Sequence, residues 1–148
     1  KWLWYKDSKT RNYKMTKKIC IVVSTYNSEI TKEIFNSAKN QLKNLNIEKF
    51  DTVKIPGAFE IPVTIARLAK QYDGFIAIGC IIKGETANFD LISKSITDGI
   101  MFLSVLEKKP IGNAILTCLN KKQGFDRFDK GKEAANAVVS VLENVSNK

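Results

Sequence analysis

Histidine is missing from all 148 residues, and this absence excludes several kinds of site at once. Without an imidazole there is neither a His-ligated metal centre nor a Ser-His or Cys-His nucleophile pair. No apolar run approaches the ~20 residues that a membrane-spanning helix needs. Residues 1–18 are basic, but the apolar core of a secretory signal does not follow them. We therefore expect no metal ion and no membrane partner.

Cysteine and arginine are scarce as well. The three cysteines, Cys20, Cys80 and Cys118, lie in apolar strand-like runs without C-x-x-C spacing, which is typical of reduced, buried thiols in a cytoplasmic protein. Only three of the 24 basic residues are arginine, the side chain that base readout favours. Seven bases and one acid in residues 1–18 supply six of the nine net positive charges. Nucleic-acid binding through this leader is the weakest of three functional hypotheses, and we expect solvated lysines instead.

What the chain does contain is a regular alternation of strand and helix patterns. A continuous β-branched run predicts a buried strand at residues 19–23, and residues 52–55, 75–80 and 114–117 are predicted as three further strands. Apolar residues at helical spacing predict helices within residues 30–45, 61–69, 89–106 and 134–145, with Ser28 as the N-cap of the first. Parallel strands need crossovers of this length, and those crossovers are right-handed. We therefore predict an α/β fold: a three-layer α/β/α sandwich around a short, mostly four-stranded parallel sheet with flavodoxin-like winding.

The predicted domain covers residues 17–148, with residues 1–16 as a non-native or flexible extension. Its strand ends carry the polar and aromatic residues 24–27, 56–60 and 80–88. In open α/β sheets, ligands bind beyond the carboxyl ends of the strands. An aromatic ring suits a flat heterocycle, and a helix N-terminus suits a phosphate. The chain has no Walker or Rossmann glycine pattern, so a nucleotide is not implied.

Taken singly, these residues have plainer interpretations, and composition and spacing leave both open. Tyr26 and Phe59 could be core or rim aromatics. Glu60 could be an acid favoured by a helix dipole, and Gly84-Glu85-Thr86 could be only a turn and cap. Arg127, between two aspartates, could be part of a solvated ion pair of little energetic value.

Four co-linear motifs point further. They are Tyr26-Asn27, Pro56-Gly57-Ala58-Phe59-Glu60-Ile61-Pro62, the segment from Gly79 to Thr86 followed by Phe89-Asp90, and Lys130-Gly131-Lys132-Glu133-Ala134-Ala135. Over residues 17–145 the chain resembles the 6,7-dimethyl-8-ribityllumazine synthase family. The resemblance implies condensation of 5-amino-6-(D-ribitylamino)uracil with 3,4-dihydroxy-2-butanone 4-phosphate, the penultimate step of riboflavin biosynthesis, without metal or organic cofactor. It also implies a homopentamer, or a higher assembly, with sites between adjacent subunits.

The resemblance assigns a role to each matching position. Pyrimidine and ribityl binding would fall to Tyr26, Asn27, Ala58, Phe59, Glu60, Cys80, Ile81, Ile82 and Asn113. The phosphate would be held by Gly84, Glu85, Thr86 and Arg127, the arginine coming from the neighbouring subunit. The catalytic positions would be Asn88, Arg127 and Lys130.

Three departures from the family pattern matter for function. Asn88 stands where the family has a histidine taken to shuttle protons, and asparagine cannot carry a proton near neutral pH. Asn113 replaces an aromatic residue that covers the pyrimidine from the partner subunit, and the stretch between Arg127 and Lys130 is shortened. Two further hypotheses follow: an active but slowed lumazine synthase, or a homologue that binds riboflavin-like ligands or acts as a scaffold without turnover.

Overall fold

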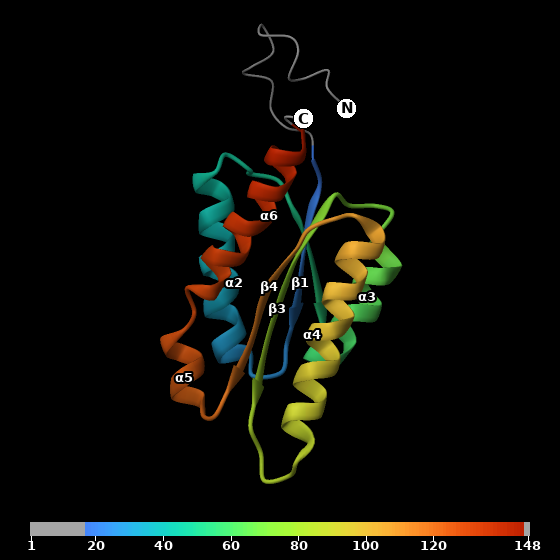
Figure 1. The fold of residues 1–148 in the computed structure, drawn as a ribbon. Coiled ribbons are helices and arrows are strands. Elements are labelled where there is room, and N and C mark those ends of the chain that lie inside the picture. The colour runs from blue at the N-terminus through green and yellow to red at the C-terminus, as the bar shows by residue number, and fades with distance from the viewer. Residues whose placement is uncertain (1–16, 147–148) are drawn as a thin grey trace, which may run out of the picture.

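The computed structural model describes residues 17–146, so the predicted extension 1–16 and residues 147–148 lie outside it. Four parallel strands form one sheet in the order β2-β1-β3-β4 (Figure 1). The strands are β1 (Ile19–Ser24), β2 (Asp51–Ile55), β3 (Gly74–Ile82) and β4 (Ile111–Cys118). The helices are α2 (Ser28–Asn44), α3 (Ile61–Leu68), α4 (Asn88–Glu107), α5 (Lys121–Asp126) and α6 (Lys130–Ser146), with a 3-10 turn η2 (Ala58–Glu60).

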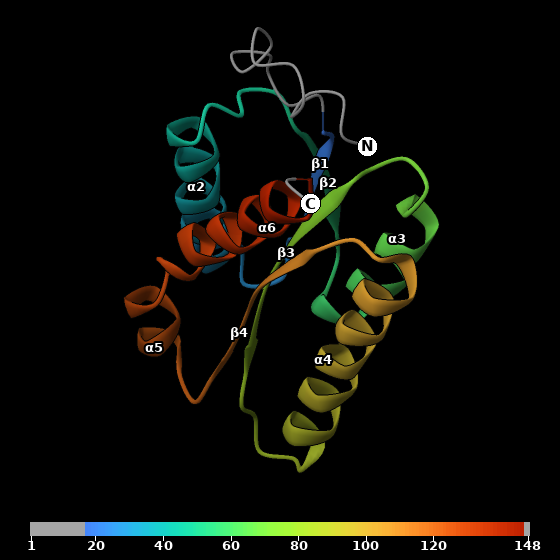
Figure 2. The same ribbon diagram turned by 45° about the horizontal axis from the view of Figure 1, so that its top comes forward.

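Helices cover both faces of the sheet, which confirms the predicted three-layer α/β/α sandwich. Figure 2 shows α2 and α6 side by side on one face, and α3 with α4 on the other. Every residue of β1 is buried, as a continuous β-branched run predicts for a strand between two helix layers. Alternate side chains serve the two cores: Ile21 and Val23 pack towards α2 and α6, whereas Cys20 and Val22 pack towards α3 and α4.

The winding of the chain reverses between β1 and β3. The chain leaves β1 through α2 on one face and reaches the outer strand β2, then returns through α3 on the opposite face to β3. Such a reversal opens a crevice between the carboxyl ends of the two strands, where open α/β sheets bind ligands. In Figure 1 these strand ends meet at the lower edge of the sheet.

Two local predictions need correction, and one helix was missed. Ser28 is not the N-cap of α2, because it already lies within the helix; Asn27 is the N-cap, and its carbonyl accepts from the backbone N–H of Ile30 and of Thr31. The strands β3 and β4 are longer than predicted, since their ladder runs from Phe75–Ile111 to Ile82–Cys118. The short helix α5 was not predicted at all. It is capped by Asn120, whose Oδ1 accepts from Gln123 N at 2.9 Å.

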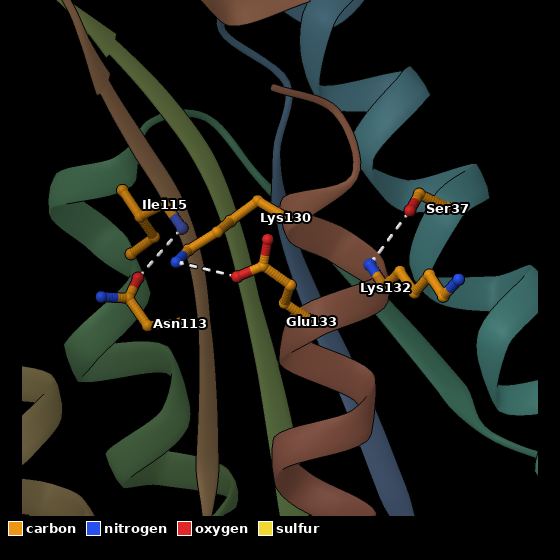
Figure 3. Close-up of polar contacts among 6 residues, drawn as sticks. All are labelled: Ser37, Asn113, Ile115, Lys130, Lys132 and Glu133. Atoms are coloured by element: carbon orange, nitrogen blue, oxygen red, sulfur yellow. Dashed lines mark hydrogen bonds and ion pairs between the residues drawn. The ribbon is translucent and has the colours of Figure 1, made fainter. Parts of the chain in front are cut away.

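One glycine explains the close packing of α6 on α2. A β-carbon at Gly131 would lie 2.2 Å from the carbonyl oxygen of Ile34, so only glycine lets the start of α6 reach the backbone of α2. In the same place, the backbone N–H of Lys132 donates to Ser37 Oγ at 3.0 Å (Figure 3). The Lys130-Gly131 motif therefore has a packing role, whatever else its lysine does.

Candidate active site

Two aromatic side chains stand in solvent at the carboxyl end of the sheet. Tyr26 follows β1 and is 72% exposed, and Phe59 belongs to the η2 turn after β2 and is 64% exposed. Neither is a core residue, so the core interpretation of these two aromatics is wrong. Their exposure leaves ring faces open to a flat ligand.

The turn that carries Tyr26 is tied to both neighbouring strand ends. On one side, the backbone N–H groups of Thr25 and Tyr26 donate to the carbonyls of Ile55 and Pro56 at 2.8 and 2.9 Å. On the other side, the Asn27 side-chain amide donates to the carbonyl of Cys80 at 3.0 Å. Residues 25–27 thus join the ends of β1, β2 and β3.

Glu60 lies half-buried in the η2 turn, with part of its bonding capacity already used. Its Oε1 accepts from the backbone N–H of Gly57 at 3.0 Å, and its carbonyl accepts from Thr64 Oγ1 at 2.7 Å. These contacts cap the 3-10 turn and hold the carboxylate at the strand ends. Gly79 of β3 makes room for the turn, because a β-carbon there would lie 3.2 Å from the Ala58 β-carbon.

At the end of β3, the side chains of residues 80–82 pack into the protein, so the backbone is the part available to a ligand. The Cys80 side chain is buried beneath α5, and burial, followed by the nearby Cys118 thiol, raises the pKa of Cys80 to about 12. The thiol is therefore neutral and cannot act as a nucleophile at ordinary pH. Ile81 packs against the α3–α4 core and Ile82 against the opposite core, each only partly buried.

The segment from Lys83 to Ala87 connects β3 to the N-terminus of α4. Its start is fixed by the backbone N–H of Lys83, which donates to the Cys118 carbonyl at 2.8 Å. Gly84, Glu85 and Thr86 are all exposed. No side chain caps α4, so its first-turn N–H groups have no bond from an N-cap side chain. The positive end of the dipole of this 20-residue helix points at the segment. Asn88 is exposed and begins the helix.

Three predicted residues do not join this group within one chain. Asn113 lies early in β4, where it pairs with Ala77. The carboxyl end of the strand, at Cys118, is about 17 Å further along. The Asn113 Oδ1 accepts from the backbone N–H of Ile115 at 3.0 Å (Figure 3). Arg127 and Lys130 belong to the end of α5 and the start of α6, on the face opposite α4 (Figure 1).

The charged side chains near Arg127 do not engage it. Among residues 17–146 Arg127 forms no ion pair, since Asp126 pairs with Lys122 at 2.8 Å instead. Lys130 Nζ lies 3.5 Å from Glu133 Oε1, a long contact between exposed side chains (Figure 3). The ion-pair interpretation of Arg127 therefore does not hold within the described chain.

The family model of 6,7-dimethyl-8-ribityllumazine synthase matches residues 16–146. The chain belongs to this family. Similar proteins named 6,7-dimethyl-8-ribityllumazine synthase occur in Limosilactobacillus reuteri, at 38% identity over 86% of this chain and 87% of the relative, and in Lactiplantibacillus plantarum, at 37% over 86% and 84%. A third, from Arthrobacter, is 34% identical over 83% of this chain and 81% of the relative.

Within this lumazine synthase fold, sequence reasoning found the strand ends but missed two features that shape them. The bond between Asn27 and Cys80 joins residues that are 53 positions apart, and no local pattern predicts it. The capped helix α5 does leave a signal, which is Asn120 followed three residues later by Gln123. The side-chain carbonyl of Gln123 also accepts from the Leu119 N–H at 2.7 Å.

Among residues 17–146 no group of acidic, cysteine or histidine side chains is placed to hold a metal ion, and no helix is long and apolar enough to span a membrane.

Proposed function

We propose that this chain condenses 5-amino-6-(D-ribitylamino)uracil with 3,4-dihydroxy-2-butanone 4-phosphate to form 6,7-dimethyl-8-ribityllumazine, as a transferase of riboflavin biosynthesis. The observation that carries this proposal is one edge of the sheet, where the exposed rings of Tyr26 and Phe59 share the strand ends with an uncapped N-terminus of a 20-residue helix. A flat heterocycle and a phosphate are the two ligand parts that such an edge can bind. The buried free thiols Cys20, Cys80 and Cys118 support a cytoplasmic setting.

In the proposed complex, Tyr26 stacks on the pyrimidine. Residues 58–60 and 80–82 hold the edge of the ring and the ribityl chain. The exposed turn at residues 84–86 and the start of α4 hold the phosphate, with Arg127 of a neighbouring copy as the charged partner. Arginine suits this task because its guanidinium binds phosphate through two parallel hydrogen bonds.

The chemistry then follows from placing two substrates together. The substrate amine attacks the ketone, and an imine forms with loss of water. Phosphate leaves as its C–O bond breaks, and the second amine closes the ring with loss of another water. Holding both reactants in one site supplies much of the rate enhancement, because effective molarities of oriented reactants are large.

The site is proposed to form between subunits of a homopentamer. Asn113 lies early in β4, and Arg127 and Lys130 lie on the face opposite α4, so we assign these three residues to the slot of a neighbouring subunit. Large apolar side chains on the outer surface of α4 also need a partner: Met101, Phe102, Val105 and Leu106 are 59–67% exposed. A contiguous apolar patch of this kind marks a protein interface, and a head-to-tail contact that closes makes a ring.

Asn88 makes the proposed enzyme a slow one. An exposed amide at the first residue of α4 can orient a water or a phosphate oxygen, but it does not exchange a proton at neutral pH. Loss of one general acid–base group typically slows an enzyme about 10²–10⁴-fold. Water, Lys130 or the substrate phosphate then has to carry the protons.

Turnover is tested by giving the purified protein both substrates and recording lumazine fluorescence against the uncatalysed rate. A rate above that background supports the proposal, and a rate equal to it refutes enzymatic function. A second arm tests the shared site by mixing Tyr26→Ala and Arg127→Ala subunits. If each site takes these two residues from different subunits, random pentamers regain about a quarter of the intact sites, whereas sites within one chain regain none.

A second candidate function is ligand binding or scaffolding without turnover, favoured by the replacement of two family positions by Asn88 and Asn113. It predicts saturable binding of the lumazine product or riboflavin, read by fluorescence polarisation, with no product formed from the substrates. Product formation above background would exclude it.

A further inference from the structure

The crevice where the winding reverses is not open down to the sheet. The β1–β3 ladder ends at the pair Val23 with Ile78, and beyond it the Asn27 side chain connects the two segments. Its Nδ2 donates to the Cys80 carbonyl at 3.0 Å, in partly buried surroundings. This bond links the chain after β1 to the end of β3 at the switch point of the fold.

Asn27 also has a special backbone. Its φ and ψ of 59° and 45° are left-handed, and only two other non-glycine residues in the described chain, Asn46 and Lys108, have positive φ. Asparagine tolerates this conformation better than most residues. The left-handed step turns the chain from β1 into α2, while the Asn27 carbonyl starts the helix by accepting from Ile30 N and Thr31 N at 3.0 and 3.1 Å.

The neighbouring Tyr26 depends on this turn for its position. Its side chain is 72% exposed, so little packing holds the ring. Its backbone is fixed by the bond from Tyr26 N to the Pro56 carbonyl on one side and by Asn27 on the other. The Asn27 side chain therefore ties the backbone that carries the Tyr26 ring to the end of β3.

We infer that Asn27 is a positioning residue, whose amide fixes the spacing between the Tyr26 ring and the β3 end and so the width of the pyrimidine slot. This assignment differs from the expectation that Asn27 itself binds substrate. It rests on the proposed function for the identity of the slot and for the kinetic readout, whereas the exchange readout is independent of it. The bond from Asn27 to the Cys80 carbonyl forms in the absence of ligand. An amide that served only to bind substrate would have no partner until substrate was present.

The test uses Asn27→Gly, which keeps positive φ easily accessible but removes the amide. In the ligand-free protein, we expect amide hydrogen exchange of Tyr26 and of residues 80–82 to speed up about tenfold, because one net hydrogen bond holds the turn. With both substrates, KM for the ribitylaminouracil should rise about tenfold while kcat and KM for the butanone phosphate stay within about twofold. Asn27→Asp should behave alike, since a carboxylate cannot donate to the Cys80 carbonyl.

Asn46→Gly is the matched control. Asn46 also has positive φ, at 66°, but it lies in the loop after α2, at the other end of the sheet. We expect it to change neither the exchange of Tyr26 nor either KM. If Asn27→Gly does not fold, Asn27→Asp provides the same comparison.

The outcomes separate this inference from the proposed function. Unchanged exchange in ligand-free Asn27→Gly or Asn27→Asp overturns the positioning role, even if KM rises, because that pattern fits direct substrate contact. Faster exchange with a selective rise in KM establishes it. If the wild-type protein shows no turnover, the proposed function fails while the exchange experiment still decides whether Asn27 holds the turn.

Discussion

The two ends of the sheet differ in how their polar groups are used. At the amino end, polar groups bind one another: Tyr72 Oη donates to Asp51 Oδ2 at 2.5 Å, and the Lys18 N–H donates to Asp73 Oδ2 at 2.8 Å. The Lys109 ammonium group donates to the Ala69 carbonyl nearby. At the carboxyl end, the aromatic rings and the turn at residues 84–86 face solvent. Groups that are already paired stabilise the fold, and groups left open are the ones that can bind a ligand.

The internal hydrogen bonds at the carboxyl end fit this contrast. The carboxyl end does contain internal bonds, such as Glu60 to Gly57 and Asn27 to Cys80, but these hold the backbone in place beneath exposed side chains. A rigid support below open functional groups is what a binding site needs, since binding then costs little ordering of the chain. Substitutions at the carboxyl end should therefore change activity, and those at the amino end should change stability.

The largest expected effect is at Asn88. Replacing it with histidine, Asn88→His, should raise the rate of lumazine formation about 10²–10⁴-fold, because an imidazole at the start of α4 can exchange a proton near neutral pH. The variant's rate should also gain a pH dependence that the wild-type rate lacks, centred near the ordinary imidazole pKa of about 6.5. Steady-state fluorescence from pH 5 to 8 measures both. The control Asn46→His, at the other end of the sheet, should leave the rate unchanged, and an unaltered rate in Asn88→His would remove position 88 as the limiting feature.

A smaller but still large loss is expected at Arg127. Removing the guanidinium in Arg127→Ala should lower kcat/KM about 10²–10³-fold, mainly through the butanone phosphate, because one donor to a developing or bound anion is lost. Initial rates at varied concentrations of each substrate separate the two KM values. Lys122→Ala on the same helix removes an exposed charge that is paired with Asp126, and it should change kcat/KM by less than about twofold. Equal losses in the two variants would contradict a specific role for Arg127.

The smallest effect tests the amino end. Tyr72→Phe should lower the free energy of unfolding by about 1 kcal/mol, through loss of one hydrogen bond, and leave lumazine formation unchanged. In the folded protein the bond to Asp51, followed by partial burial, raises the pKa of Tyr72 from 10.0 to about 12. The stabilisation is therefore complete below pH 10 and is lost as pH rises towards 12. Urea unfolding of both proteins from pH 8 to 12 should show their difference shrinking with pH. A change in the activity of Tyr72→Phe would contradict the view that the amino end serves stability alone.

Much of the fold followed from local patterns. Strands β1, β3 and β4 are largely apolar, and α2, α3, α4 and α6 each have an apolar stripe, so the order and approximate bounds of these elements follow from neighbouring residues. The candidate site was predicted to the extent that strand ends in such a fold must meet at one edge. The cap of α2 was missed because Ser28 and Asn27 are both good cap residues, and the choice depends on a left-handed turn that the end of β3 supports.

Sequence alone determined the alternation of strands and helices, the absence of imidazole chemistry, and the lumazine synthase motifs with Asn88 at the start of α4. Only the tertiary structure decided that Tyr26 and Phe59 stand in solvent, that α5 is the element covering the buried Cys80 thiol, and that Asn113 lies far from the strand ends. The physical reason is distance along the chain. Local patterns report contacts between near neighbours, whereas the bond from Asn27 to Cys80 forms only after two crossovers have brought β1 and β3 together.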